Sequence, residues 1–98
     1  MAKFTIQNTH KKRMKLSLNV PNYSPDTGMV LNWESNFKIK VSDINGSILI
    51  EANTDGLVSL ANHLLNLSQS SVPTGTHLHL DENNSLEDGS LDLIIEKI

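Results

Sequence analysis

The dipeptide Asn45-Gly46 constrains the fold of this chain more than any other feature of its sequence. It stands between two runs, residues 37–44 and 47–52, in which apolar and polar residues alternate. Alternation with a period of two is typical of a half-buried strand, and Asn-Gly readily takes the two positive-φ positions of a type I′ turn. The sequence therefore predicts a tight hairpin. Its expected register pairs Ile44 with Ser47, Val41 with Ile50, Ile39 with Ala52, and Lys40 with Glu51.

Three further alternating runs lie upstream of this hairpin. Residues 3–7 and 13–20 predict two strands joined by a charged turn, and residues 29–33 predict a third strand. A three-residue loop at 34–36 would place Trp33 and Phe37 on the same face, whereas a two-residue loop would place them on opposite faces. We therefore expect residues 29–33 to extend the same antiparallel sheet.

The apolar period changes after residue 53. Apolar residues now recur at intervals of three and four, which predicts an amphipathic helix over about 54–69 with Thr54 as its N-cap. Ser59, Asn62 and Asn66 would form the solvent-facing side, with His63 at its border. The residues expected to pack on the sheet are Leu57, Leu60, Ala61, Leu64 and Leu65.

Two more strands are expected near residues 76–81 and 91–98. Leu91, Leu93 and Ile95 would line one face of the last strand, with Ile94 and Ile98 on the other. A strand that is apolar on both faces indicates a central position or an outer face covered by a partner. The chain is therefore predicted to form a single α+β domain over residues 1–98. We expect a mostly antiparallel sheet of about seven strands with one helix packed on one face.

Composition excludes several classes of protein. None of the 98 residues is cysteine, so a disulfide framework and a thiol nucleophile are impossible. The first ten residues lack the apolar run of a signal peptide, and no apolar stretch approaches the roughly 20 residues of a membrane span. A cytoplasmic protein without a membrane or cofactor is the simplest expectation.

Charge is unevenly distributed along the chain. Residues 1–40 hold seven basic and two acidic residues, whereas residues 41–98 hold one basic and nine acidic residues. Such separation can steer encounter with a charged partner. Alternatively, the two halves interleave in space and neutralise each other. The basic run at 10–13 has no aromatic residues beside it, so direct binding of nucleic acid is not expected.

The stretch at residues 77–81 places His77, His79 and Asp81 on one face of a strand, opposite Leu78 and Leu80. Neighbouring histidines with a carboxylate can bind zinc at an open site, as metal-dependent hydrolases do. However, Glu82 stands where a metallo-β-lactamase-like motif has another histidine, and His10 and His63 are distant in sequence. We favour the interpretation that these are exposed strand residues, and expect no bound metal.

The C-terminal half resembles a known family. The resemblance covers residues 54–98 and rests on the helix around Gly56 and Leu60, the Gly75-x-His77-x-His79 strand, and Gly89-Ser90 before the final strand. It is similar to family thirty-two of the immunity proteins that accompany bacterial polymorphic toxins. The resemblance implies a non-enzymatic cytoplasmic protein that binds and blocks a cognate toxin.

An acidic surface suits that role, because it would be attracted to the basic active site of a toxin that attacks nucleic acid. The residues expected to bind the partner are Asp81, Glu82, Glu87, Asp88, Asp92, His77 and His79. Two alternatives stay open. One is a small metal-dependent hydrolase using His77, His79 and Asp81, and the other is a self-associating adaptor domain, joined as a homodimer through a sheet edge or the last strand.

Overall fold

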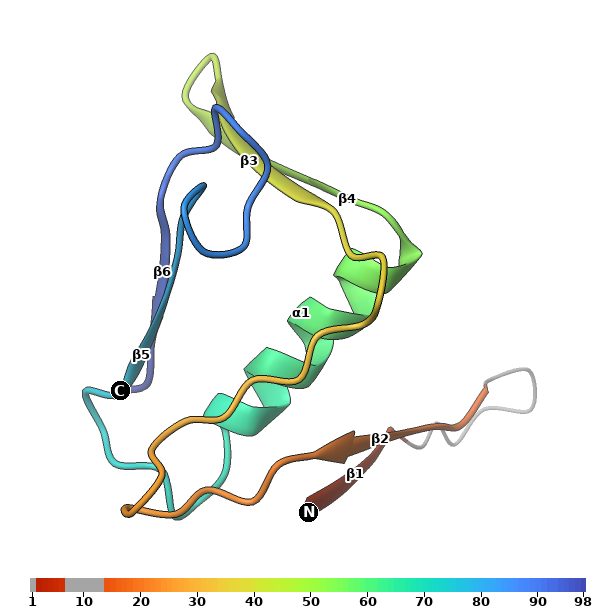
Figure 1. Ribbon diagram of the computed structural model, residues 1–98, viewed down its shortest axis with the longest axis vertical. Coiled ribbons are helices and arrows are strands. Elements are labelled where there is room, and N and C mark those ends of the chain that lie inside the picture. Colours follow the sequence, from red (N-terminus) through yellow and green to blue (C-terminus); the bar gives the residue numbers. More distant parts are fainter. Residues whose placement is uncertain (1, 7–13) are drawn as a thin grey trace.

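The computed structural model describes residues 2–6 and 14–98. In these residues one helix and six strands are arranged as three antiparallel strand pairs around the helix (Figure 1). The elements in chain order are β1 (Ala2–Ile6), β2 (Leu16–Val20), β3 (Ile39–Ile44), β4 (Ser47–Ala52), α1 (Thr54–Leu67), β5 (His77–Leu80) and β6 (Leu93–Glu96). The pairs are β1–β2, β3–β4 and β5–β6.

The β3–β4 hairpin confirms the prediction made from Asn45-Gly46. Both turn residues have positive φ, 51° at Asn45 and 85° at Gly46, as a type I′ turn requires. The observed register is the predicted one and runs from Ile44 opposite Ser47 to Ile39 opposite Ala52. The local pattern of the sequence was therefore sufficient to set both the turn and the strand pairing.

The α+β class is confirmed, but the single sheet of about seven strands is wrong. Residues 29–33 form no strand, and the three strand pairs are separate. Residues 21–38 instead follow α1 as an irregular extended segment, drawn in orange to yellow beside the helix (Figure 1). Trp33 and Phe37 do share a face, because their rings stack with centroids 4.3 Å apart.

The middle of the extended segment is held by polar side chains of α1. Ser59 Oγ accepts a hydrogen bond from the Glu34 amide at 2.8 Å. Asn66 Nδ2 donates to the Val30 carbonyl at 2.7 Å. Because these main-chain groups already have partners on the helix, the segment needs no neighbouring strand. This explains why an alternating run did not become a strand.

The same kind of contact holds both ends of the segment. At one end, Gln69 Nε2 donates to the Pro21 carbonyl at 2.8 Å, and Asn62 Nδ2 donates to the carbonyl of Asn19, in the adjoining end of β2, at 2.9 Å. At the other end, the N-terminus of α1 receives main-chain amides of the segment. Asp55 Oδ2 accepts from the Asn36 amide at 3.2 Å and Asn53 Oδ1 from the Lys38 amide at 3.0 Å. We call this set of side-chain to main-chain bonds the amide ladder.

The predicted orientation of α1 is therefore wrong. Ser59, Asn62 and Asn66 are buried rather than solvent-facing. Leu57 and Leu64, which were expected to pack on the sheet, are 56% and 45% exposed. Apolar periodicity indicated a helix correctly, but it could not show that hydrogen bonds to a neighbouring segment would bury the polar side.

The start of α1 lies close to the start of β3. The N-cap is Asn53 rather than the expected Thr54, and its Oδ1 accepts from the Gly56 amide at 2.7 Å. A Cβ added at Gly56 would collide with the Lys38 carbonyl oxygen. Glycine at this position therefore permits the close approach that brings the Lys38 amide within reach of Asn53.

The apolar core consists of two clusters that β5 joins. One contains Ile39, Val41, Leu80 and Leu86, and the other contains Leu67, Val72 and Leu78. Successive apolar residues of β5, Leu78 and Leu80, belong to different clusters. The short strand therefore ties the β3–β4 hairpin to the C-terminal end of α1.

Strands β2 and β6 are less covered than the sequence suggested. In β2, Val20 is buried, whereas Leu16 is exposed and so is Met14 just before the strand. The residues of the connecting turn, including His10, lie outside the described part of the chain. β6 pairs only with β5 in the described residues, so it is not central, and its Ile94 remains exposed as do Leu91 and Ile98.

His63 is a fully buried residue of α1 at the edge of the core. Its ring meets that of Trp33 edge-on, with centroids 4.2 Å apart. Neither ring nitrogen has a hydrogen-bond partner among the described residues. Burial lowers the pKa of His63 to about 4, so the side chain is neutral near pH 7.

The amide ladder predicts an unusual ranking of substitutions on α1. Asn66→Ala leaves the Val30 carbonyl without its partner and should lower the free energy of unfolding by about 1–3 kcal/mol. Leu64→Ala changes a half-exposed side chain and should cost about 1 kcal/mol or less. Urea unfolding of both variants measures the difference. A larger loss for Leu64→Ala would show that the leucine side of the helix is the buried one.

Acid should destabilise the protein through His63. The unfolded chain binds a proton at this residue below about pH 6.5, whereas the folded chain does so only near pH 4. The resulting contribution to stability is complete above pH 6.5 and is lost toward pH 4, with a total of about 3 kcal/mol. The control is His63→Phe, which cannot titrate at this position. On acidification, the free energy of unfolding of this variant minus that of the parent should therefore rise by that amount. Parallel pH profiles for the two proteins would contradict the prediction.

Candidate partner-binding surface

The outer face of the β5–β6 hairpin carries the two histidines of the His-x-His motif. His77 and His79 are exposed, while Leu78 and Leu80, which alternate with them, are buried. The register places Glu96 opposite His77 and Ile94 opposite His79. The predicted division of this strand into an apolar inner face and a histidine-bearing outer face is confirmed.

The acidic loop, residues 81–92, continues directly from β5 and is organised by its own polar side chains. Asp81 Oδ1 accepts from the amides of Asn83 and Asn84, at 2.8 and 3.1 Å. Asn84 Nδ2 donates back to the His79 carbonyl at 2.9 Å. Glu82 Oε2 accepts from the Gly89 amide at 2.8 Å and so joins the two halves of the loop. These bonds fix the direction in which the loop presents its charges.

The same loop is attached to the free side of β3. The Glu87 amide donates to the Ile39 carbonyl at 2.9 Å, and the Leu91 amide donates to the Val41 carbonyl at 2.8 Å. Ser90 Oγ accepts from the Val41 amide at 3.2 Å. Leu86, which is buried in the first core cluster, anchors the loop from inside. The acidic loop is therefore a fixed part of the domain.

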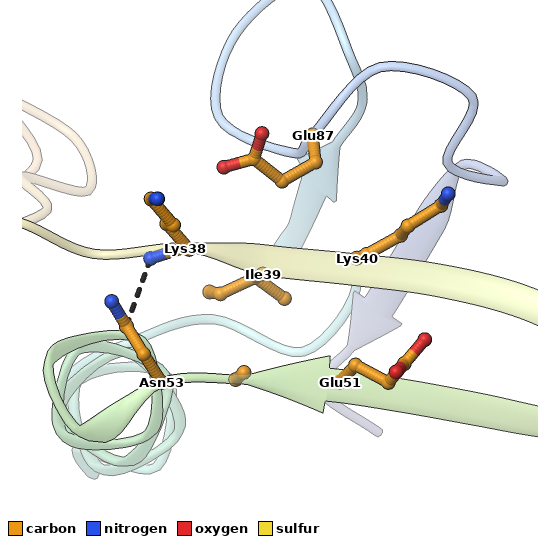
Figure 2. Close-up of a pocket in the computed structure, with 7 residues that line it drawn as sticks. Lys38, Ile39, Lys40, Glu51, Asn53 and Glu87 are labelled. Carbon is orange, nitrogen blue, oxygen red and sulfur yellow. Dashed lines mark hydrogen bonds between the residues drawn. The ribbon is translucent and has the colours of Figure 1, made fainter.

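Most acidic side chains of the loop face solvent. Glu82, Glu87, Asp88 and Asp92 are exposed, and among the described residues no lysine or arginine forms an ion pair with them. Glu87 is the loop carboxylate that shares a cavity with lysine residues. It lines a shallow surface cavity of about 410 Å³ together with Lys38, Lys40 and Glu51 (Figure 2). The basic and acidic halves of the chain therefore interleave at this cavity, but not at the rest of the loop.

One histidine and two carboxylates of this surface lie within reach of a single ion. His79 Nε2 lies 3.2 Å from Asp92 Oδ2 and 3.8 Å from Asp81 Oδ2. One ligand atom from each of the three residues falls within 4.8 Å of the others. His77 is not part of the group, because its Nδ1 is directed at the Gly75 carbonyl, 3.4 Å away. Of the predicted candidates, the structure brings together His79 and Asp81 but replaces His77 with Asp92.

Sequence spacing could not identify Asp92 as a neighbour of His79. The two residues are 13 positions apart, and only the return of the chain through the acidic loop brings them together. His63, the other described histidine outside the motif, lies in the core against Trp33.

Comparison with known proteins identifies the family. A family model described as immunity protein 32 matches residues 47–98, which is more than half of the chain. The chain belongs to this family. The match begins at β4 and includes α1, the β5–β6 hairpin and the whole acidic loop. The resemblance noted in the sequence is thereby confirmed.

Neither the curated proteins nor the solved structures contain a match to this chain. Membership in an immunity protein family suggests a protein that acts by binding rather than by catalysis. Helices capable of crossing a membrane are absent from the described residues.

The geometry of the histidine cluster leads to a prediction about metal. The cluster offers three ligands, of which His79 and Asp92 are exposed and Asp81 is half-buried. The Asp81 carboxylate already accepts two main-chain amides, and three ligands fall short of the four of a structural zinc site. Elemental analysis of the purified protein should therefore give well below one zinc per chain. One equivalent of zinc, lost in Asp92→Ala and kept in His77→Ala, would contradict this expectation and establish a site at the cluster.

Proposed function

We propose that this protein neutralises a protein toxin in the cytoplasm by covering it with the acidic loop and the adjoining face of the β5–β6 hairpin. Family membership supports a toxin as the general class of partner. The residues assigned to the interface are Asp81, Glu82, Glu87, Asp88, Asp92, His77 and His79.

The observation that carries this proposal is a set of exposed carboxylates on a fixed loop. The carboxylates of Asp81 and Glu82 accept main-chain hydrogen bonds that hold the loop, and Leu86 anchors it in the core. Little conformational entropy would then be lost when a partner binds, which favours affinity. Asp88 and Asp92 extend from this support without a lysine or arginine partner in the described part of the chain.

Charge gives the proposal its mechanism. An enzyme that acts on nucleic acid binds phosphates with lysine and arginine. A rigid acidic surface is attracted to such a site over a long range, which raises the association rate. Once bound, the loop occupies the space that the nucleic acid would need. His79, which lies beside Asp92, sits at the border between the loop and the flat outer face of the hairpin.

The alternative of a metal-dependent hydrolase gains no support from the arrangement. The histidine pair that would define such a site is divided, since His77 lies outside the cluster of potential ligands. The remaining residues, His79, Asp81 and Asp92, lie on an exposed or half-buried surface rather than in an enclosed pocket.

A charge-removing variant tests the proposal. Glu87→Gln, Asp88→Asn and Asp92→Asn together remove three charges but leave Asp81 and Glu82, which hold the loop, unchanged. Stability should change by no more than about 0.5 kcal/mol per residue, because all three side chains are exposed. Association with the cognate toxin should slow by about tenfold or more and become less dependent on salt, as loss of interface charge predicts.

The matched control removes three charges outside the assigned interface, through Asp26→Asn, Glu34→Gln and Asp43→Asn. These residues are also exposed, so net charge and fold are the same in both variants. If both variants associate with the toxin at the same rate, the acidic loop is not the interface.

A further inference from the structure

The outer edge of β4 is an open sheet edge. In a hairpin with a two-residue turn, the residues that flank the turn exchange hydrogen bonds, and every second residue beyond them points its main-chain groups outward. In β4 the outward residues are Ile48, Ile50 and Ala52. Within the described residues nothing hydrogen-bonds to the amides or carbonyls of Ile48 and Ile50. An extended strand could pair with β4 along its length.

The side chains on this edge are mostly apolar and exposed. Ile48 is 62% exposed, and Leu49, Ile50 and the adjacent Ile44 are also accessible. Glu51 is the single charged residue of Ser47–Ala52. Open edges are usually protected by lysine, proline or a bulge, and β4 has none of these. Its composition fits a partner strand better than it fits water.

The opposite edge of this small sheet is already occupied. Residues 87–91 bond to β3 through Ile39 and Val41, on the side away from β4. The sheet can therefore grow only through β4. This direction leads away from the acidic loop, so the loop stays accessible when β4 is paired.

The total surface also leaves room for a standard interface. The chain exposes 6747 Å², whereas a compact protein of its mass, 10.8 kDa, exposes about 5,500 Å². The excess is larger than the roughly 800 Å² that each partner buries in a standard protein interface. The exposed side chains of Ile44, Ile48, Leu49 and Ile50 contribute to this surface.

We propose that a second copy of this chain covers the edge, through antiparallel pairing of β4 with β4 about a two-fold axis at Leu49. Leu49 then faces Leu49 of the other copy, and Ile48 faces Ile50, so four isoleucines gather on one side of the joined sheet. Glu51 faces Ser47, which keeps the two carboxylates off directly opposed positions. A two-fold axis at Ile50 would instead pair Ile48 with Ala52 and bury less apolar surface. The strand is thus complementary to itself, as an isologous interface requires.

Sedimentation at increasing protein concentration tests the association. The parent should pass from monomer to dimer, and Ile48→Lys should remain monomeric because it places a charge among the isoleucines. The control is Ile94→Lys, which changes an equally exposed isoleucine, 60% accessible, on β6 and should dimerise like the parent. A parent that stays monomeric up to millimolar concentration, or a loss of dimer in Ile94→Lys alone, would overturn the proposal. A monomeric parent whose Ile48→Lys variant fails to bind the toxin would assign the edge to the toxin instead.

Cross-linking tests the register. The chain has no cysteine, so a single introduced cysteine can form a disulfide only with the same residue of another copy. In Leu49→Cys the two Cα atoms would lie about 4.5 Å apart across the axis, within the range that a disulfide spans. In Ser47→Cys the two thiol-bearing residues would lie about 13 Å apart along the strands. Mild oxidation should therefore give covalent dimer from Leu49→Cys and at most a few per cent of that yield from Ser47→Cys. Equal yields from both variants would show random collision rather than strand pairing.

Discussion

The structure depends on the amide ladder between α1 and the extended segment before β3. Side chains of Ser59, Asn62, Asn66 and Gln69 replace the neighbouring strand that main-chain groups of the segment would otherwise need. Each bond contributes only about 1 kcal/mol net, but a buried main-chain group left without a partner costs more than that. The ladder therefore forms as a unit, and it determines which side of α1 is inside.

Burying the polar side of α1 has consequences for the rest of the molecule. Leu57 and Leu64 are turned toward solvent, and no continuous sheet can form, because the extended segment takes the place where a strand would join the hairpins. The β3–β4 pair is left with an open edge at β4, and apolar residues such as Ile48 and Ile94 lie on the surface. A protein built in this way is suited to binding through its exposed strands, which is consistent with membership in an immunity protein family.

Features that depend on residues close together along the chain could be predicted from the sequence. The Asn45-Gly46 turn, the β3–β4 register, the span of the helix and the exposure of His77 and His79 followed from local pattern. The orientation of α1 could not be predicted, because a reading from apolar periodicity places polar residues in solvent. A side-chain amide that is hydrogen-bonded to a main-chain group distant in sequence can instead be buried. The contact between His79 and Asp92 could not be predicted either, because it depends on the path of the acidic loop.

The family match leaves out the extended segment that the ladder holds. The match covers residues 47–98, whereas residues 19–38, which α1 holds, lie outside it. In the ladder the helix contributes specific side chains, such as Asn62 and Asn66, and their hydrogen-bond partners are main-chain groups. The segment adds side-chain packing, such as Trp33 against His63, outside the ladder. Main-chain amides and carbonyls are the same for nearly every residue type, so many sequences can occupy the extended segment without loss of these bonds. The sequence requirements of this interaction therefore fall on the helix, which lies within the matched region, and much less on the segment that the helix holds.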